Sequence, residues 1–123
     1  EIPVGASNLH ALWDDALDTG RPRRRARGAP GPEARTAQAA QVADRVERRW
    51  PLSAVRARVA LTDPARWADE SLVLAATTVY PGVGDGGPVS AAYRARMRAT
   101  AEPQAAVAGY RLAALLERAL GGR

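Results

Sequence analysis

The chain has 123 residues and a formal net charge of +5, with 46% apolar and 25% charged residues. These proportions are typical of one globular domain and exclude a fully disordered or collagen-like chain. Cysteine is absent, which excludes disulfides, cysteine–zinc sites and thiol catalysis, and the only histidine is His10. No apolar run reaches the roughly 18 to 20 residues of a membrane-spanning helix, so we expect no membrane partner.

The basic charge is carried entirely by arginine, because all 18 basic residues are arginine and lysine is absent. The resulting pI of about 10.9 favours an anionic partner such as nucleic acid. A GC-rich coding sequence would produce the same alanine- and arginine-rich composition, so this explanation stays open beside the first.

Apolar residues recur at helical spacing in the N-terminal half and predict an all-α fold of about five helices. Ser7 or Asn8 can cap a first helix over residues 7–18, whose apolar face is formed by Leu9, Leu12, Trp13, Ala16 and Leu17. Residues 19–35 combine six arginines with prolines and glycines and predict a mobile loop. A second helix is expected over 36–50, followed by a short helix or a turn over 52–60.

The C-terminal half is expected to hold three more helices. Asp63-Pro64 opens a helix that runs to about Val79, with Trp67, Leu74, Ala75 and Thr78 on its buried side and an Arg66–Glu70 pair at i,i+4. The glycine-rich stretch that follows predicts a turn. Ser90 can cap a helix over 91–100, and Glu102-Pro103 opens a last helix over 103–120 with Val107, Tyr110, Leu112, Leu115, Leu116 and Leu120 as its apolar residues.

The sharpest chemical feature is His10 with Asp14, four residues apart in the string Asn8-Leu9-His10-Ala11-Leu12-Trp13-Asp14. This spacing places an imidazole and a carboxylate on one helix face, where both can bind the same metal ion. A surface hydrogen bond or ion pair is the alternative. The adjacent acids Asp69 and Glu70 are interpreted as an exposed charged face, and the aromatic residues as core rather than base-stacking residues.

This string resembles the NLHxxWD signature of the zinc-dependent single-strand-specific nucleases, the S1-type family of mung bean nuclease. Two further blocks resemble the same family in the same order. They are Trp67-Ala68-Asp69-Glu70-Ser71, similar to its WAxES helix, and Ala108-Gly109-Tyr110-Arg111-Leu112-Ala113-Ala114-Leu115-Leu116, similar to its closing AGxRLAxLL helix. The resemblance covers nearly the whole chain except the arginine-rich segment.

The resemblance implies a mostly helical, secreted enzyme with three zinc ions. It implies hydrolysis of single-stranded DNA or RNA to 5′-phosphate products and 3′-nucleotidase activity. By carry-over, His10 and Asp14 ligate one zinc ion, and Asn8 caps the helix or touches substrate. The loop arginines Arg21, Arg23, Arg24, Arg25 and Arg27 either grip phosphate or form a solvated loop.

The chain departs from the family in its supply of ligands. The family's other histidines and aspartates, and its N-terminal tryptophan, lie before the NLHxxWD block. We therefore expect residues 1–123 to be the C-terminal portion of one nuclease domain, inactive alone, with the N-terminal half as its partner. No secretory signal pattern is seen in residues 1–5. The alternatives are a non-catalytic arginine-rich module that binds nucleic acid, or an inactive family remnant.

Overall fold

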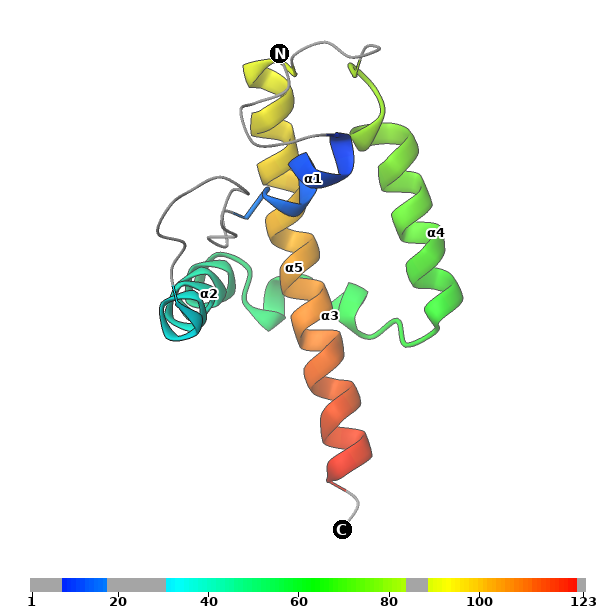
Figure 1. Cartoon of the computed structure of the whole chain (residues 1–123). Coiled ribbons are helices and arrows are strands. Elements are labelled where there is room, and N and C mark those ends of the chain that lie inside the picture. Colours follow the sequence, from blue (N-terminus) through cyan, green and yellow to red (C-terminus); the bar gives the residue numbers. More distant parts are fainter. Residues whose placement is uncertain (1–7, 18–30, 84–88, 122–123) are drawn as a thin grey trace.

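Every regular element of residues 8–17, 31–83 and 89–121, the part described by the computed structural model, is a helix (Figure 1). The elements in chain order are α1 (Leu9–Asp14), α2 (Pro32–Arg49), α3 (Leu52–Val59), α4 (Pro64–Leu74), the short π-helix η1 (Ala75–Val79) and α5 (Ala91–Leu120). The predicted all-α class is confirmed. Among these described helices, none combines the length and the apolar character that a membrane span requires.

The helix α5 is the axis of the fold, and its 30 residues extend over about 45 Å. The helices α2 and α3 contact its middle, while α1 and η1 pack beside its N-terminal part (Figure 1). The C-terminal end of α5 projects beyond the other elements. The arrangement therefore places α1, with His10 and Asp14, at the well-packed end of the axis.

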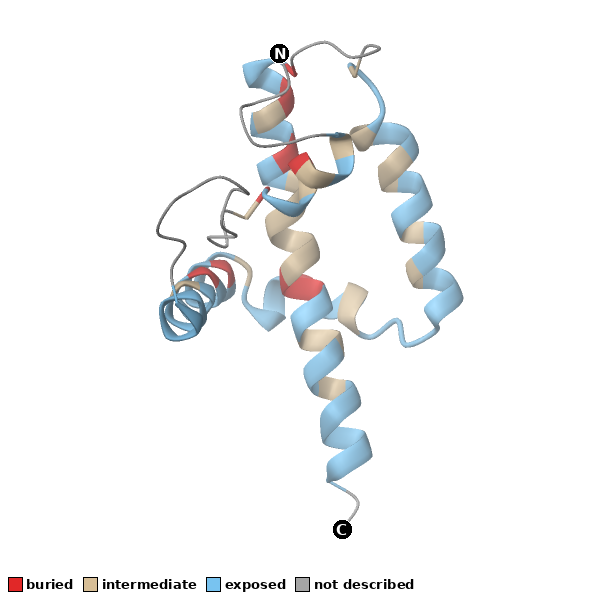
Figure 2. Ribbon diagram, viewed as in Figure 1, coloured by how far each residue is buried: buried red, intermediate tan, exposed pale blue. Residues whose placement is uncertain are grey.

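Two small apolar clusters pack α1 and α2 against α5 (Figure 2). The first joins α1 to the start of α5 and consists of Leu12, Ala16, Val89, Tyr93 and Met97. The second joins α2 to the middle of α5 and consists of Val42, Val46 and Ala106. The apolar face predicted for the segment 7–18 is confirmed as its covered side, since Leu12 and Ala16 are buried and Leu9, Trp13 and Leu17 are partly buried.

Two predicted boundaries need correction at the N-terminal side. The helix expected over 7–18 is shorter, since α1 ends at Asp14 and Ala16 and Leu17 lie in the turn that follows. The loop expected over 19–35 is too long, because α2 begins at Pro32. Gly31 occupies the N-cap position. Pro32 is suited to the first turn because an N–H there would have no partner within the helix, and proline lacks that N–H. The negative charge of Glu33 is favourable at the positive end of the helix dipole. Residues 19–30 lie outside the described part.

The two helices expected over 91–100 and 103–120 form one continuous helix, which is a further correction. Pro103 lies inside α5, where it cannot donate to the carbonyl four residues earlier. Such a proline normally ends or kinks a helix. Here Met97 is buried on one side of it and Ala106 and Val107 on the other, and we attribute the continuity of α5 to this packing.

The remaining helix predictions agree in position. The segment 52–60 is a helix, α3, and the helix expected from Pro64 to about Val79 is α4 continued by η1. The side of this helix that was predicted to be buried is its less exposed side. All four of the predicted residues there are partly covered: Trp67, Leu74, Ala75 and Thr78.

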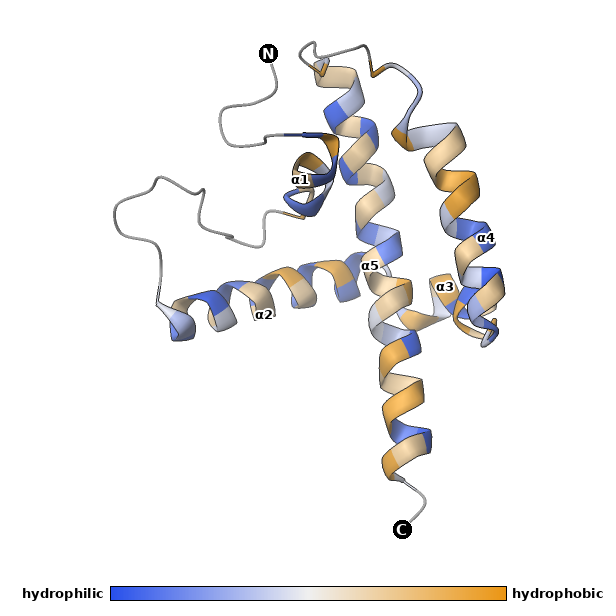
Figure 3. Cartoon of the chain, turned by 45° about the vertical axis from the view of Figure 1, so that its right-hand side comes forward, coloured by the Kyte–Doolittle hydropathy of each residue, from blue (hydrophilic) through white to orange (hydrophobic). Residues whose placement is uncertain are grey.

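The apolar face predicted near the C-terminus is not covered by the described residues. Figure 3 shows apolar residues on the projecting end of α5, and the side chains there are exposed: Leu112, Leu115, Leu116 and Leu120. The apolar spacing correctly predicted a helix here. The prediction that these residues pack against other helices is wrong for the described residues, because this end of α5 extends past every described helix that could cover it (Figure 1).

Candidate metal site on α1

The helix α1 begins at a cap supplied by Asn8. Its backbone is extended, with φ −164° and ψ 175°, and its Oδ1 accepts a hydrogen bond from the N–H of Ala11 at 2.9 Å. This bond satisfies one of the N–H groups that have no partner in the first turn of a helix. The capping role predicted for Asn8 is confirmed, and a contact with substrate stays a prediction.

His10 and Asp14 lie on the opposite face of α1 from the core. Leu12 is buried against α5, and Leu9 and Trp13 pack against the same cluster, as expected. The His10 side chain is 87% exposed and that of Asp14 is 39% exposed. The short helix therefore presents both predicted ligands outward while its apolar residues anchor it.

The two predicted ligands are close enough to share a metal ion. His10 Nε2 lies 3.5 Å from Asp14 Oδ2. Bonds of about 2.0–2.2 Å from zinc to nitrogen and oxygen place neighbouring ligand atoms of a tetrahedral site roughly 3.3–3.6 Å apart. The pair thus fits one edge of a zinc tetrahedron, although the same distance also suits the ion pair that the sequence left open.

A complete site needs ligands that α1 does not supply. The described residues contain no group of three or more His, Cys, Asp or Glu side chains that could hold a metal ion. A zinc site takes three or four protein ligands. His10 and Asp14 therefore fit half of one coordination sphere.

Tyr93 connects α1 to the rest of the fold by a route that the sequence did not reveal. Trp13 Nε1 donates to Tyr93 Oη at 2.8 Å, and Tyr93 Oη donates to the carbonyl of Val79 at 2.7 Å. The two rings meet edge to face, with centroids 6.4 Å apart. The predicted core position of Tyr93 is confirmed, but helical periodicity cannot reveal a hydrogen bond between side chains 80 residues apart in the sequence.

Comparison with known proteins decides the family. The S1/P1 nuclease family model matches residues 3–121. This chain belongs to the S1/P1 nuclease family. No curated protein and no solved structure matches it. The resemblance seen in the three sequence blocks is thereby confirmed, and the first block coincides with the α1 site.

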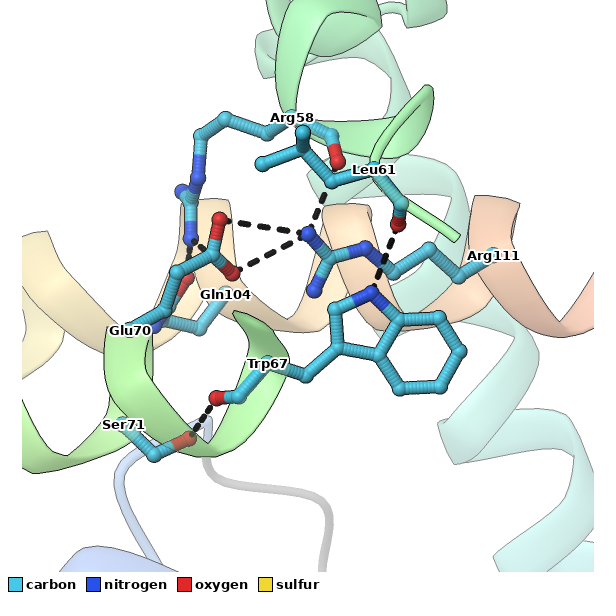
Figure 4. Close-up of polar contacts among 7 residues, drawn as sticks. All are labelled: Arg58, Leu61, Trp67, Glu70, Ser71, Gln104 and Arg111. Atoms are coloured by element: carbon cyan, nitrogen blue, oxygen red, sulfur yellow. Dashed lines mark hydrogen bonds and ion pairs between the residues drawn. The ribbon is translucent and has the colours of Figure 1, made fainter. Parts of the chain in front are cut away.

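The other two S1/P1 nuclease blocks meet each other across the fold (Figure 4). Glu70 on α4 accepts hydrogen bonds from Arg111 Nη2 on α5, and Arg58 at the end of α3 pairs with the same carboxylate at 3.8 Å. Arg58 also donates to Gln104. The Trp67 indole N–H donates to the carbonyl of Leu61 at 2.6 Å. These contacts join α3, α4 and α5.

This cluster corrects two predictions for the nuclease. Asp69 is exposed as expected, but the Glu70 side chain is only 24% exposed. Its partners are Arg58 and Arg111 instead of Arg66, which was expected to pair with it along α4. An i,i+4 neighbour on an exposed helix competes poorly with a largely buried guanidinium, because solvent screens the exposed pair.

Some of the remaining predicted residues lie in the described part of the chain, and others lie outside it. Among the aromatic residues, Tyr93 is buried, Trp50, Trp67 and Tyr110 are partly covered, and Tyr80 is exposed, which is an exception to the predicted core role. Gly82 begins the predicted glycine-rich turn with φ +82°. The rest of that stretch, 84–88, lies outside the described residues. So do the proposed phosphate contacts Arg21, Arg23, Arg24, Arg25 and Arg27.

Proposed function

We propose that this S1/P1 nuclease hydrolyses single-stranded DNA or RNA to 5′-phosphate products, removes 3′-phosphates from nucleotides, and uses His10 and Asp14 to ligate one of three zinc ions. The observation that supports this role is the 3.5 Å separation of His10 Nε2 and Asp14 Oδ2 on the exposed face of α1. Bound zinc would lower the pKa of a water molecule, so that hydroxide is available as the nucleophile near neutral pH, and would neutralise the charge that develops on the phosphodiester.

In this proposal the remaining zinc ligands come from another segment, the N-terminal half of the nuclease domain, as the family resemblance implies. The ligand count supports it, because the 123 residues include one histidine and the described part has no cluster of three ligands. The exposed leucines of α5 offer an apolar surface against which such a segment can pack. Residues 1–123 alone are then inactive. By the same resemblance the enzyme is secreted.

The chain's own residues would orient the ligands and attract substrate. Asn8 and Leu12 fix the start and the inner face of α1, so the imidazole and the carboxylate project together. In the 19–35 segment, Arg21, Arg23, Arg24, Arg25 and Arg27 would contact substrate phosphates. Such contacts make affinity fall with salt.

The test is native mass spectrometry of the protein purified from its source without chelators, followed by hydrolysis of a single-stranded oligonucleotide. We expect a species larger than 13.0 kDa with three zinc ions. His10→Ala and Asp14→Ala should each lower hydrolysis more than about 100-fold, since loss of even an outer partner of a metal ligand costs 10–100-fold.

Asp15→Ala is the matched control, because Asp15 is the neighbouring exposed acid and is not part of the proposed site. It should retain both zinc content and hydrolysis. Unchanged zinc content and turnover in His10→Ala would exclude the proposed metal site. A metal-free 13.0 kDa species that binds oligonucleotides without cleaving them would instead support the arginine-rich binding module.

A further inference from the structure

The helix α1 cannot be held by its own hydrogen bonds. It has only six residues, whereas isolated helices shorter than about 12–15 residues are marginal in water. The 3.5 Å spacing of His10 and Asp14 exists only while this segment is helical. Contacts with the rest of the fold must therefore keep the ligand pair in place.

One of these contacts is polar and runs through Tyr93. Its hydroxyl accepts from Trp13 Nε1 at 2.8 Å and donates to the Val79 carbonyl at 2.7 Å, so both hydrogen-bonding directions of the oxygen are used. Val79 is the last residue of η1, and the final carbonyls of a helix have no partner within it. The hydroxyl thus satisfies an otherwise unpaired carbonyl while it holds the indole.

Tyr93 is itself rigidly placed. It is 2% exposed, and its backbone N–H donates to Ser90 Oγ at 3.1 Å at the start of α5. The guanidinium of Arg96 lies 5.0 Å from the centroid of its ring and donates to the Pro81 carbonyl at 2.6 Å. Tyr93 therefore ties α1 to a fixed frame formed by α5 and the end of η1.

We propose that Tyr93 is a positioning residue for the His10–Asp14 pair. Through Trp13, which lies one residue before Asp14, its hydroxyl keeps α1 helical and so keeps the two ligand atoms together before metal binds. This inference rests on the proposed role of α1 in metal binding. Its consequence is that loss of the hydroxyl weakens metal binding although Tyr93 touches neither ligand.

The experiment compares Tyr93→Phe with Tyr110→Phe in the full chain. Both variants keep the ring and remove one hydroxyl bonded to a backbone carbonyl, but Tyr110 donates to Trp50 in the other part of the core. Three quantities are measured for each: the Kd for Zn²⁺, from NMR titration of the backbone amide signals of α1, the hydrogen exchange of the same amides, and the midpoint of thermal unfolding.

Tyr93→Phe should raise the Kd for Zn²⁺ and speed the exchange of α1 by roughly 2- to 12-fold, which is the effect of one hydrogen bond. Tyr110→Phe should leave both within about twofold even if it lowers the thermal midpoint, because sites without shared contacts act independently. A purely structural Tyr93 would lower the midpoint without changing the Kd or the α1 exchange, and that result would overturn the inference.

A second comparison tests whether Tyr93 acts on α1 through its hydrogen bond with Trp13. Trp13→Phe removes the donor, so Tyr93→Phe should add no further change in Kd within that background. Additive effects would show that Tyr93 does not act through Trp13.

The variant His10→Ala separates this inference from the proposed function. If Zn²⁺ binding is unchanged in His10→Ala, the proposed metal site is refuted. If binding is lost in His10→Ala but unchanged in Tyr93→Phe, only the positioning role of Tyr93 is refuted.

Discussion

Arg111 Nη2 lies 3.2 and 3.0 Å from the two carboxylate oxygens of Glu70, which joins the last of the three family-like blocks, on α5, to the middle block, on α4. The same nitrogen donates to the Arg58 carbonyl at 2.7 Å, and the guanidinium lies 5.0 Å from the centroid of the Trp67 ring. The Arg111 side chain is only 11% exposed. Its charge therefore depends on Glu70 for compensation.

Glu70→Gln should lower the free energy of unfolding by about 1–3 kcal/mol, because it leaves the largely buried Arg111 without a full counter-charge. Urea denaturation followed by circular dichroism measures this change. Asp69→Asn is the control, since the adjacent exposed acid should change stability by less than about 0.5 kcal/mol. Equal small effects of both substitutions would show that the Glu70–Arg111 pair does not hold α4 in place.

The all-α class and the inner face of α1 were predictable because local periodicity determines both. The Glu70–Arg111 pair was not, because it joins residues 41 positions apart. The prediction of two helices around Pro103 was wrong for a different reason. The local preference of proline to interrupt a helix is overridden by the packing of the neighbouring turns of α5. The proposed ligand pair, His10 and Asp14, was predicted from its spacing and from the family resemblance, but the contact of Trp13 with Tyr93 depends on tertiary structure.

Pro103→Ala should stabilise α5. Alanine restores an N–H that can donate to the carbonyl four residues earlier and removes the ring, a change worth up to about 3 kcal/mol in a helix interior. Pro64→Ala is the matched control, because Pro64 occupies the first turn of α4, where the N–H has no helical partner. Denaturant unfolding of both variants provides the comparison. A loss of stability in Pro103→Ala would show that contacts of the ring outweigh the missing hydrogen bond.

Leu116→Ser should leave the stability of the chain within about 0.5 kcal/mol, because the side chain is exposed on the projecting end of α5. Leu12→Ala should cost about 2–5 kcal/mol, because it opens a cavity in the cluster that anchors α1. Thermal unfolding of the chain distinguishes the two cases. A large loss in Leu116→Ser would mean that the leucines of α5 are covered in solution, by a second copy or by residues beyond the described part.

Substitutions of Asn8 can separate its confirmed capping role from the proposed contact with substrate. Asn8→Ala removes the acceptor of the Ala11 N–H and should weaken α1 by about 0.5–2 kcal/mol, whereas Asn8→Ser keeps a good cap. Hydrogen exchange of the α1 amides should therefore accelerate in Asn8→Ala and stay slow in Asn8→Ser. Hydrolysis by the complete nuclease then decides the second role. Full activity in Asn8→Ser would restrict Asn8 to capping, while a loss of turnover with α1 still protected would place its amide at the substrate.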